Sequence, residues 1–170
     1  FPYTTLFRSR QPLTQVRKLT AEAMAYAWAV APRVTQDDKA DVTAVESFRE
    51  QYNRKRDPAE KLTMTAILVK VAAQALKAFP QLNSSLDVAA QEIILKRYVH
   101  VGVAVDTEGG LLVPVIRDAD RKGLATLATE LNETAGRTRE RRVSPADMEG
   151  GTFTISNLGG IGGTHFTPIV

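Results

Sequence analysis

The chain has 170 residues, which is enough for one domain with a hydrophobic core and short for two. It contains no cysteine, which excludes disulfides, thiolate nucleophiles and cysteine-ligated metals, and its two histidines, His100 and His165, do not form an H-E-x-x-H motif. The formal charge of +3 permits an anionic ligand without indicating nucleic acid, and the basic stretch 137–142 carries no interleaved aromatic residues.

The first ten residues differ in character from the rest. Residues 1–10 show no periodicity and resemble translated adapter sequence, so we expect residues 11–170 to form the folded part. They lack the apolar run of a secretory signal, and no segment reaches the roughly 18 uninterrupted apolar residues of a membrane span. We therefore predict a soluble, cytoplasmic protein that contacts neither membrane nor nucleic acid.

The first half of the chain predicts helices and one strand. Residues 13–31 place apolar side chains at helical spacing, and Pro32 ends that helix. Residues 34–42 predict an extended strand. Thr43 and Glu46 fit a capping box, which opens a short helix that continues to about residue 52.

Residues 64–79 form the most apolar segment of the chain. Their polar members Lys70, Gln74 and Lys77 fall on one narrow stripe of a helix. We therefore predict a central core helix whose remaining surface is buried, and Pro80 stops it.

The second half predicts short strands and two more helices. Glycines at 109 and 110 supply a hairpin turn, and Pro145 suits the first position of a short helix that begins after Ser144. The predicted strands are 82–86, 93–95, 99–106, 111–116 and 152–156, and the longer helix runs from 124 to about 141. This order predicts an α/β or α+β fold, a sheet with helices on one side.

Glycines concentrate near the end of the chain. Six of the 11 lie within residues 150–163, where they bracket the strand 152–156, and Ser156 and Asn157 stand at its exit. Glycine weakens regular structure, so this density indicates tight turns or close approach of a ligand. The cluster lacks the last glycine of a dinucleotide-binding motif and the lysine of a P-loop. A binding or catalytic loop and a simple turn built around Ser156 both remain open.

The two histidines are candidates for a general base. His165 follows Ser156 by nine residues, but a serine–histidine pair needs proximity in space, which spacing does not provide. His100 lies in an apolar strand. For both, a packing role is favoured over chemistry.

Four strings of sequence are specific enough to indicate a family. They are Arg-Lys-Leu-Thr-Ala at 17–21, Phe-Pro-Gln-Leu-Asn-Ser-Ser-Leu at 79–86, Val-Ala-Val-Asp-Thr at 103–107 with Gly-Leu-Leu-Val-Pro-Val-Ile-Arg-Asp-Ala-Asp-Arg-Lys at 110–122, and Gly-Gly-Thr-Phe-Thr-Ile-Ser-Asn-Leu-Gly-Gly-Ile-Gly-Gly-Thr at 150–164. Together they resemble the catalytic domain of dihydrolipoyl acyltransferases, the core components of 2-oxoacid dehydrogenase complexes. The likeness covers residues 12–170 and is closest to the acetyl-transferring, pyruvate type.

The resemblance implies a fold like that of chloramphenicol acetyltransferase, a mixed sheet with helices on one face, and homotrimers that build a larger core. It implies acyl transfer between a dihydrolipoyl group and coenzyme A, in which a serine hydroxyl binds the oxyanion; that serine corresponds to Ser156. The family's histidine base lies in an Asp-His-Arg-x-x-Asp-Gly motif, which is expected past Val170 and includes neither His100 nor His165. Residues 11–170 are then a partial catalytic domain, inactive by itself.

The resemblance also implies ligands and partners. Coenzyme A contacts correspond to Arg49, Thr63, Asp106, Ser156 and Asn157, whereas Ala135 stands where some relatives have a polar contact. No metal is implied. The partners are a lipoyl domain, which carries the lipoyl group separately, and the decarboxylase and dihydrolipoyl dehydrogenase components. The alternative is a non-catalytic assembly or binding module of the same fold that lacks the base.

Overall fold

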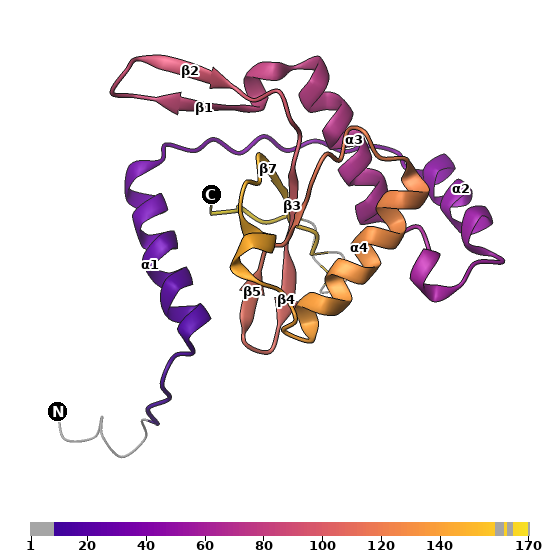
Figure 1. The fold of residues 1–170 in the computed structure, drawn as a ribbon, viewed down its shortest axis with the longest axis horizontal. Coiled ribbons are helices and arrows are strands. Elements are labelled where there is room, and N and C mark those ends of the chain that lie inside the picture. The colour runs from indigo at the N-terminus through magenta and orange to yellow at the C-terminus, as the bar shows by residue number, and fades with distance from the viewer. Residues whose placement is uncertain (1–8, 159–161, 163–164, 170) are drawn as a thin grey trace. The chain divides into compact units, whose positions relative to one another are not determined.

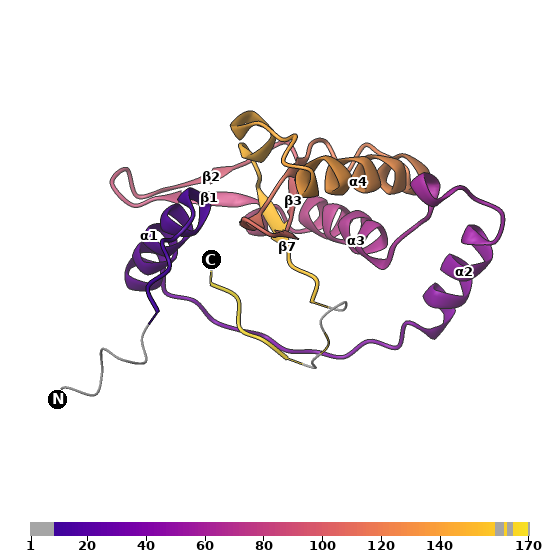
Figure 2. The same ribbon diagram turned by 90° about the horizontal axis from the view of Figure 1, so that it is seen from below.

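A computed structural model describes residues 9–158, 162 and 165–169 of the chain. Most of the segment 1–10, which the sequence predicts to be foreign to the fold, lies outside the described residues. The chain divides into two compact units, residues 1–36 with 165–170, and residues 37–164. Figures 1 and 2 show the elements of both. Within the described residues, no helix is long and apolar enough to cross a membrane.

The first unit contains helix α1, Gln15–Val30, close to the predicted span. The side chain of Thr14 caps its first turn by accepting a hydrogen bond from the Arg17 amide. At the other end, Arg33 stacks over Trp28, with its guanidinium carbon 4.4 Å from the ring centroid, and donates to the Ala27 carbonyl at 2.6 Å. No residue of α1 is buried.

The predicted strand at 34–42 and the predicted capping box are both wrong. Residues 31–42 form no regular structure, and no strand in the described part of the chain pairs with them. Helix α2, Thr43–Asn53, has Val42 at its N-cap position, so Thr43 is the first helical residue and not the cap. Asp41 accepts hydrogen bonds from the Thr43 hydroxyl and amide, and these bonds lower the pKa of the Asp41 carboxyl. Glu46 accepts a hydrogen bond from Arg49 instead of from the backbone amide at the helix start.

The second unit is built on two adjacent helices, α3, Met64–Ala78, and α4, Leu124–Arg139. They lie side by side in both views (Figures 1 and 2). The core lies between them and the central strand β3, Val101–Val103, all of whose residues are buried. Its fully buried members, at or near zero exposure, are Leu62, Ala66, Val69, Ala73, Val101, Ile116, Ala119, Leu127 and Ala128.

Helix α3 is buried on one face only, so the prediction of near-complete burial is wrong. Leu68 and Val71 are 41% and 60% exposed, because α4 and the strands of the unit cover only the opposite side. Lys70, predicted to face solvent, is half-buried and donates to the carbonyls of Asp120 and Lys122 at 2.9 and 2.7 Å.

The strands of the described residues form three small sheets. In the largest, β3 lies between β6, Val115–Ile116, which is antiparallel to it, and β7, Phe153–Ile155, which is parallel. Each of the predicted strands 99–106 and 111–116 is divided in two. The end of the first, β4, Val105–Thr107, pairs with the start of the second, β5, Gly110–Leu112, as a separate hairpin. The third sheet is the hairpin β1, Ser84–Asp87, and β2, Glu92–Leu95. The hairpin turn at 108–110 and the mixed sheet with its helices are confirmed.

Short helical turns also occur among the described residues of this unit. They are η2, Pro58–Glu60, η3, Pro80–Leu82, and η4, Pro145–Met148. The turn η4 begins at Pro145, directly after Ser144, as predicted. Ser144 and Asp147 form a capping box there, whose hydrogen bonds from the Ser144 amide and hydroxyl hold the pKa of Asp147 below its ordinary value.

Candidate active site

Strand β7 presents Ser156 and Asn157 at its carboxyl end, where both are exposed. The strand runs parallel to β3, with Val101 opposite Phe153 and Val103 opposite Ile155. One further bond, from the Ala104 amide to the Ile155 carbonyl at 3.0 Å, holds the strand up to the residue before Ser156. The Ser156 hydroxyl is therefore carried by a backbone segment that the buried strand β3 holds in place.

Asn157 ties this strand exit to the start of helix α3. Its side-chain nitrogen donates to the hydroxyl of Thr65 at 3.1 Å. Thr63, one of the predicted coenzyme A contacts, is the N-cap of α3, and its hydroxyl accepts a hydrogen bond from the Ala66 amide at 3.1 Å. Two of the residues assigned by resemblance, Thr63 and Asn157, thus both bond to the first turn of α3.

Arg49, the predicted phosphate ligand, is already paired. Its Nε donates to one Glu46 oxygen at 2.8 Å, its Nη2 donates to the other, and its Nη1 reaches the Leu62 carbonyl at 3.5 Å. The hydrogen bonds from Arg49 lower the pKa of Glu46, and the same pair raises the pKa of Arg49. Because Leu62 precedes Thr63, Arg49 lies beside the α3 N-terminus.

Asn53 fixes this junction from the end of α2. It donates to the Leu62 carbonyl at 2.9 Å and accepts from the Leu62 amide at 2.8 Å. This two-way bond satisfies the backbone of a fully buried residue. Asp106 is exposed on β4, two residues after Ala104, whose amide donates to the Ile155 carbonyl.

His100 has a structural role, as the packing interpretation predicted. Its Nδ1 accepts a hydrogen bond from the Asp118 amide at 2.9 Å, and its ring lies 4.7 Å from that of Tyr98. Its backbone carbonyl accepts from the Thr152 amide at 2.7 Å, which aligns the start of β7. His165 is exposed and belongs to the first unit.

Sequence reasoning missed a clamp that sets the entry of β7. The Nη2 of Arg117 donates to the carbonyls of Ala146 and Glu149 at 2.9 and 3.1 Å. Gly150 follows with φ of +78°, and a Cβ built on it would lie 3.3 Å from Arg117 Nη1. The positive φ favours glycine at 150, and an added Cβ would press on the Arg117 guanidinium. No local pattern links an arginine after β6 to a turn about thirty residues later.

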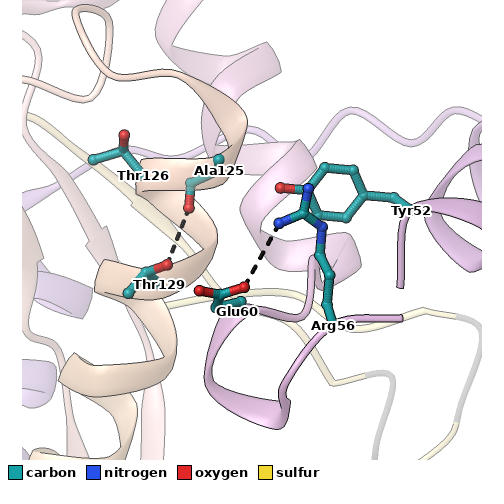
Figure 3. A pocket seen from close by; sticks show the side chains of 6 residues that line it. All are labelled: Tyr52, Arg56, Glu60, Ala125, Thr126 and Thr129. Atoms are coloured by element: carbon teal, nitrogen blue, oxygen red, sulfur yellow. Dashed lines mark hydrogen bonds and ion pairs between the residues drawn. The ribbon is translucent and has the colours of Figure 1, made fainter. Parts of the chain in front are cut away.

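A pocket opens where α2 ends, η2 turns and α4 begins (Figure 3). It has a volume of about 260 Å³. The guanidinium carbon of Arg56 lies 4.0 Å from the ring centroid of Tyr52, and its Nη1 lies 3.6 Å from a Glu60 oxygen. The residues that line it are Tyr52, Arg56, Glu60, Ala125, Thr126 and Thr129. Across the described part of the chain, no group of three or more histidine, cysteine or acidic residues could hold a metal ion.

The site is thus a serine at the exit of β7, an outer strand of a mixed three-stranded sheet that packs with helices. Residues 7–170 match the family model of the 2-oxoacid dehydrogenases acyltransferase (catalytic domain), and the chain belongs to that family. It is similar to the dihydrolipoyllysine-residue acetyltransferase components of the pyruvate dehydrogenase complexes of Haemophilus influenzae, 44% identical over 93% of this chain, and Azotobacter vinelandii, 46% identical over 94%. The chain spans 28% and 25% of the length of these two relatives.

Solved structures agree with this assignment. A structure concerning the role of a serine, a histidine and an asparagine in the catalytic mechanism of Azotobacter vinelandii dihydrolipoamide acetyltransferase superposes with a TM-score of 0.92 and is 42% identical, over 99% of this chain and 70% of that one. The cubic core of a pyruvate dehydrogenase multienzyme complex gives the same values. A probable dihydrolipoamide acetyltransferase from Listeria monocytogenes has a TM-score of 0.91 at 33% identity, over 98% of this chain and 71% of that one.

Proposed function

We propose that this chain forms part of an acyltransferase that moves an acetyl group between a dihydrolipoyl group and coenzyme A. The observation that carries the proposal is Ser156, an exposed hydroxyl on a strand exit held by β3 and anchored through Asn157 to α3. Supporting it, the relatives named above are acetyltransferase components, and a serine features in the mechanism of one of them.

The reaction needs an oxyanion donor and a proton acceptor. The sulfur of coenzyme A loses its proton to a base and attacks the carbonyl carbon of the acetyl-dihydrolipoyl thioester, so that a C–S bond forms and the carbonyl electron pair moves to oxygen. The Ser156 hydroxyl donates a hydrogen bond to that oxyanion. Collapse then breaks the bond to the dihydrolipoyl sulfur, which takes up the proton. Neither His100 nor His165 is assigned as the base.

We propose that coenzyme A contacts the residues assigned by resemblance, and the positions of these residues limit which part of the coenzyme each can bind. Thr63 and Asn157 both bond to the first turn of α3, where small polar groups suit the pantetheine arm. Arg49 must exchange Glu46 for phosphate before it can bind the coenzyme. Asp106 offers an acceptor on β4. The chemistry calls for no metal, because a positioned hydroxyl and a base suffice for thioester exchange.

We further propose assembly into homotrimers within a larger core that works with a lipoyl domain, a decarboxylase and a dihydrolipoyl dehydrogenase in the cytoplasm. The cubic core of a similar protein supports the assembly. So does exposed apolar surface, since Phe79, Leu86 and Ile93 are 59%, 68% and 62% exposed. Sedimentation of the natural-length protein tests it, and a monomer at micromolar concentration would contradict it.

The catalytic test replaces Ser156 in the natural-length protein. Acetyl transfer from acetyl-coenzyme A to dihydrolipoamide is followed for the parent and for Ser156→Ala. We expect kcat to fall by about 100- to 1,000-fold with little change in KM, the usual size of one lost oxyanion donor. Ser85→Ala, the same chemical change on exposed β1, is the matched control.

The outcomes separate enzyme from binding module. An unchanged kcat in Ser156→Ala would reduce Ser156 to a turn residue. Coenzyme A binding without any acetyl transfer by the parent protein would favour the non-catalytic module.

A further inference from the structure

Gly102 is the middle residue of β3, the strand that lies between β6 and β7 in the largest sheet. It pairs with Val115 of β6 and with Thr154 of β7, and it is buried. Figure 1 shows β3 beside β7. The φ of Gly102 lies outside the left-handed region, so backbone conformation does not require glycine here. What glycine supplies at this position is therefore space.

A side chain on Gly102 would collide with both of its neighbours. A Cβ built there would lie 2.9 Å from Val113 Cγ1 and 3.2 Å from Thr154 Oγ1. The first distance is well inside the separation of about 3.5–4.0 Å at which carbon atoms pack. At Gly150 and Gly151, by comparison, the nearest atoms are 3.3 and 3.4 Å from the added Cβ. The structure thus leaves no room for a methyl group on the middle of β3.

The neighbours of Gly102 are held in place. Val113 is β-branched, which restricts its rotamers. The next residue, Pro114, is fully buried, and its carbonyl accepts a hydrogen bond from the Val103 amide at 3.0 Å. Thr154 is fixed by the pairing of β7 with β3. An added methyl group would therefore push these strands apart, because no adjacent gap can take it.

Ser156 follows Thr154 by two residues. Successive side chains of a strand alternate between its faces, so residues two apart share a face. Ile155 packs against the core, which places Thr154 on the opposite face and Ser156 at the next position of that face. The Ala104 amide donates to the Ile155 carbonyl at 3.0 Å, so β7 is still held by the chain of β3 at this point. A displacement of Thr154 is therefore carried to Ser156 by a short hydrogen-bonded segment.

We propose that Gly102 is a positioning residue for the Ser156 hydroxyl, a proposal that rests on the function proposed above. Because it has no side chain, Gly102 lets Val113 and Thr154 approach β3 closely, and this spacing fixes where β7 delivers Ser156. An oxyanion donor works only within hydrogen-bond distance of the oxygen in the intermediate. A displacement of about 1 Å is enough to lower the rate about 100-fold.

The test measures acetyl transfer by the natural-length parent and by Gly102→Ala, after circular dichroism has shown that both are folded at the assay temperature. We expect kcat to fall about 10- to 100-fold, with the KM for coenzyme A and for dihydrolipoamide unchanged within about two-fold. Gly136→Ala is the matched control. It makes the same change inside α4, where the new Cβ meets nothing within 4 Å, and its kcat should equal that of the parent.

A double variant tests whether the collision is the cause. Gly102→Ala/Val113→Ala removes the atom that the new Cβ would meet at 2.9 Å. We expect its kcat to recover to that of Val113→Ala alone, even though the second substitution removes packing. The double variant has room for the methyl group, so it also serves if Gly102→Ala by itself does not fold. A folded double variant that is far slower than Val113→Ala would overturn the proposal.

A second double variant separates positioning from a general loss of stability. Gly102→Ala/Ser156→Ala should have the kcat of Ser156→Ala, because a residue that acts through one hydroxyl has no effect once that hydroxyl is gone. A change that only destabilises the fold would lower kcat by the same factor in both backgrounds. That result would overturn the proposal, as would equal kcat values for Gly102→Ala and Gly136→Ala.

A structure of Gly102→Ala distinguishes failure of this proposal from failure of the proposed function. We expect the Ser156 Oγ to lie about 0.5–1 Å from its position in the parent, the distance by which the added Cβ intrudes on Val113. An undisplaced Oγ would overturn the proposal whether or not the parent is active. If the Oγ is displaced but the parent transfers no acetyl group, the positioning role stands and the catalytic assignment of Ser156 falls.

Discussion

Replacing Gly150 by alanine tests whether the entry to β7 is set by the Arg117 clamp. The φ of +78° at Gly150 costs an L-residue about 1–2 kcal/mol. The new Cβ would lie 3.3 Å from Arg117 Nη1, and the guanidinium is held by two carbonyls, so moving it weakens bonds worth about 1 kcal/mol each. We expect Gly150→Ala to lower the free energy of unfolding by about 1–3 kcal/mol.

Two other glycines provide matched controls. At Gly151, a Cβ meets nothing closer than Val115 Cγ2 at 3.4 Å, which is ordinary contact, so Gly151→Ala should stay within about 0.5 kcal/mol of the parent. At Gly136, inside α4, a Cβ meets nothing within 4 Å. Gly136→Ala should stabilise the protein by about 0.5–1 kcal/mol, because alanine loses less backbone entropy in a helix.

The measurement is urea unfolding followed by far-UV circular dichroism. With a slope of about 2 kcal/mol per molar urea, Gly150→Ala should move the midpoint down by about 0.5–1.5 M. Equal midpoints for Gly150→Ala and Gly151→Ala would refute the reasoning, because the two changes differ only in backbone conformation and in the nearness of Arg117.

Three further changes probe the core, the hairpin and the effect of acid. Leu62→Ala should cost about 3–5 kcal/mol in urea unfolding, since Leu62 is fully buried; a loss below 1 kcal/mol would contradict its place in the core. Asn83→Ala removes the bonds to the Lys96 and Tyr98 carbonyls and should cost about 2 kcal/mol, with faster amide exchange in β2 as the check. Because the pKa of Asp147 is lowered, its contribution is present at neutral pH and is lost as the pH falls below about 4; Asp147→Asn should flatten the dependence of the midpoint between pH 5 and 3, and an unchanged slope would contradict it.

Local pattern was enough for most of the helices. The apolar spacing of 64–79 and 124–141 and the proline at 145 predicted α3, α4 and η4 to within a few residues, because these signals act within one turn of helix. Where a competing local bond exists, the pattern misled. The Thr43 hydroxyl donates to the Asp41 carboxylate, and the Glu46 carboxylate accepts from Arg49. Both side chains of the predicted capping box are therefore engaged elsewhere, and the box does not form.

Contacts between distant segments were beyond local pattern. The strand predicted at 34–42 found no partner, and the strands 99–106 and 111–116 divided because their halves pair with different neighbours. Strand pairing depends on segments that are far apart along the chain. A short stretch of sequence therefore does not specify which strand pairs with which.

The same division runs through the candidate site. The sequence by itself determined that a glycine-bracketed strand leads to Ser156 and Asn157, because glycine density and alternation are local properties. Only the tertiary structure decided that Arg117 clamps the entry of that strand and that Asn157 reaches α3. These are distances between groups far apart in the chain, and folding sets them by burying a shared core.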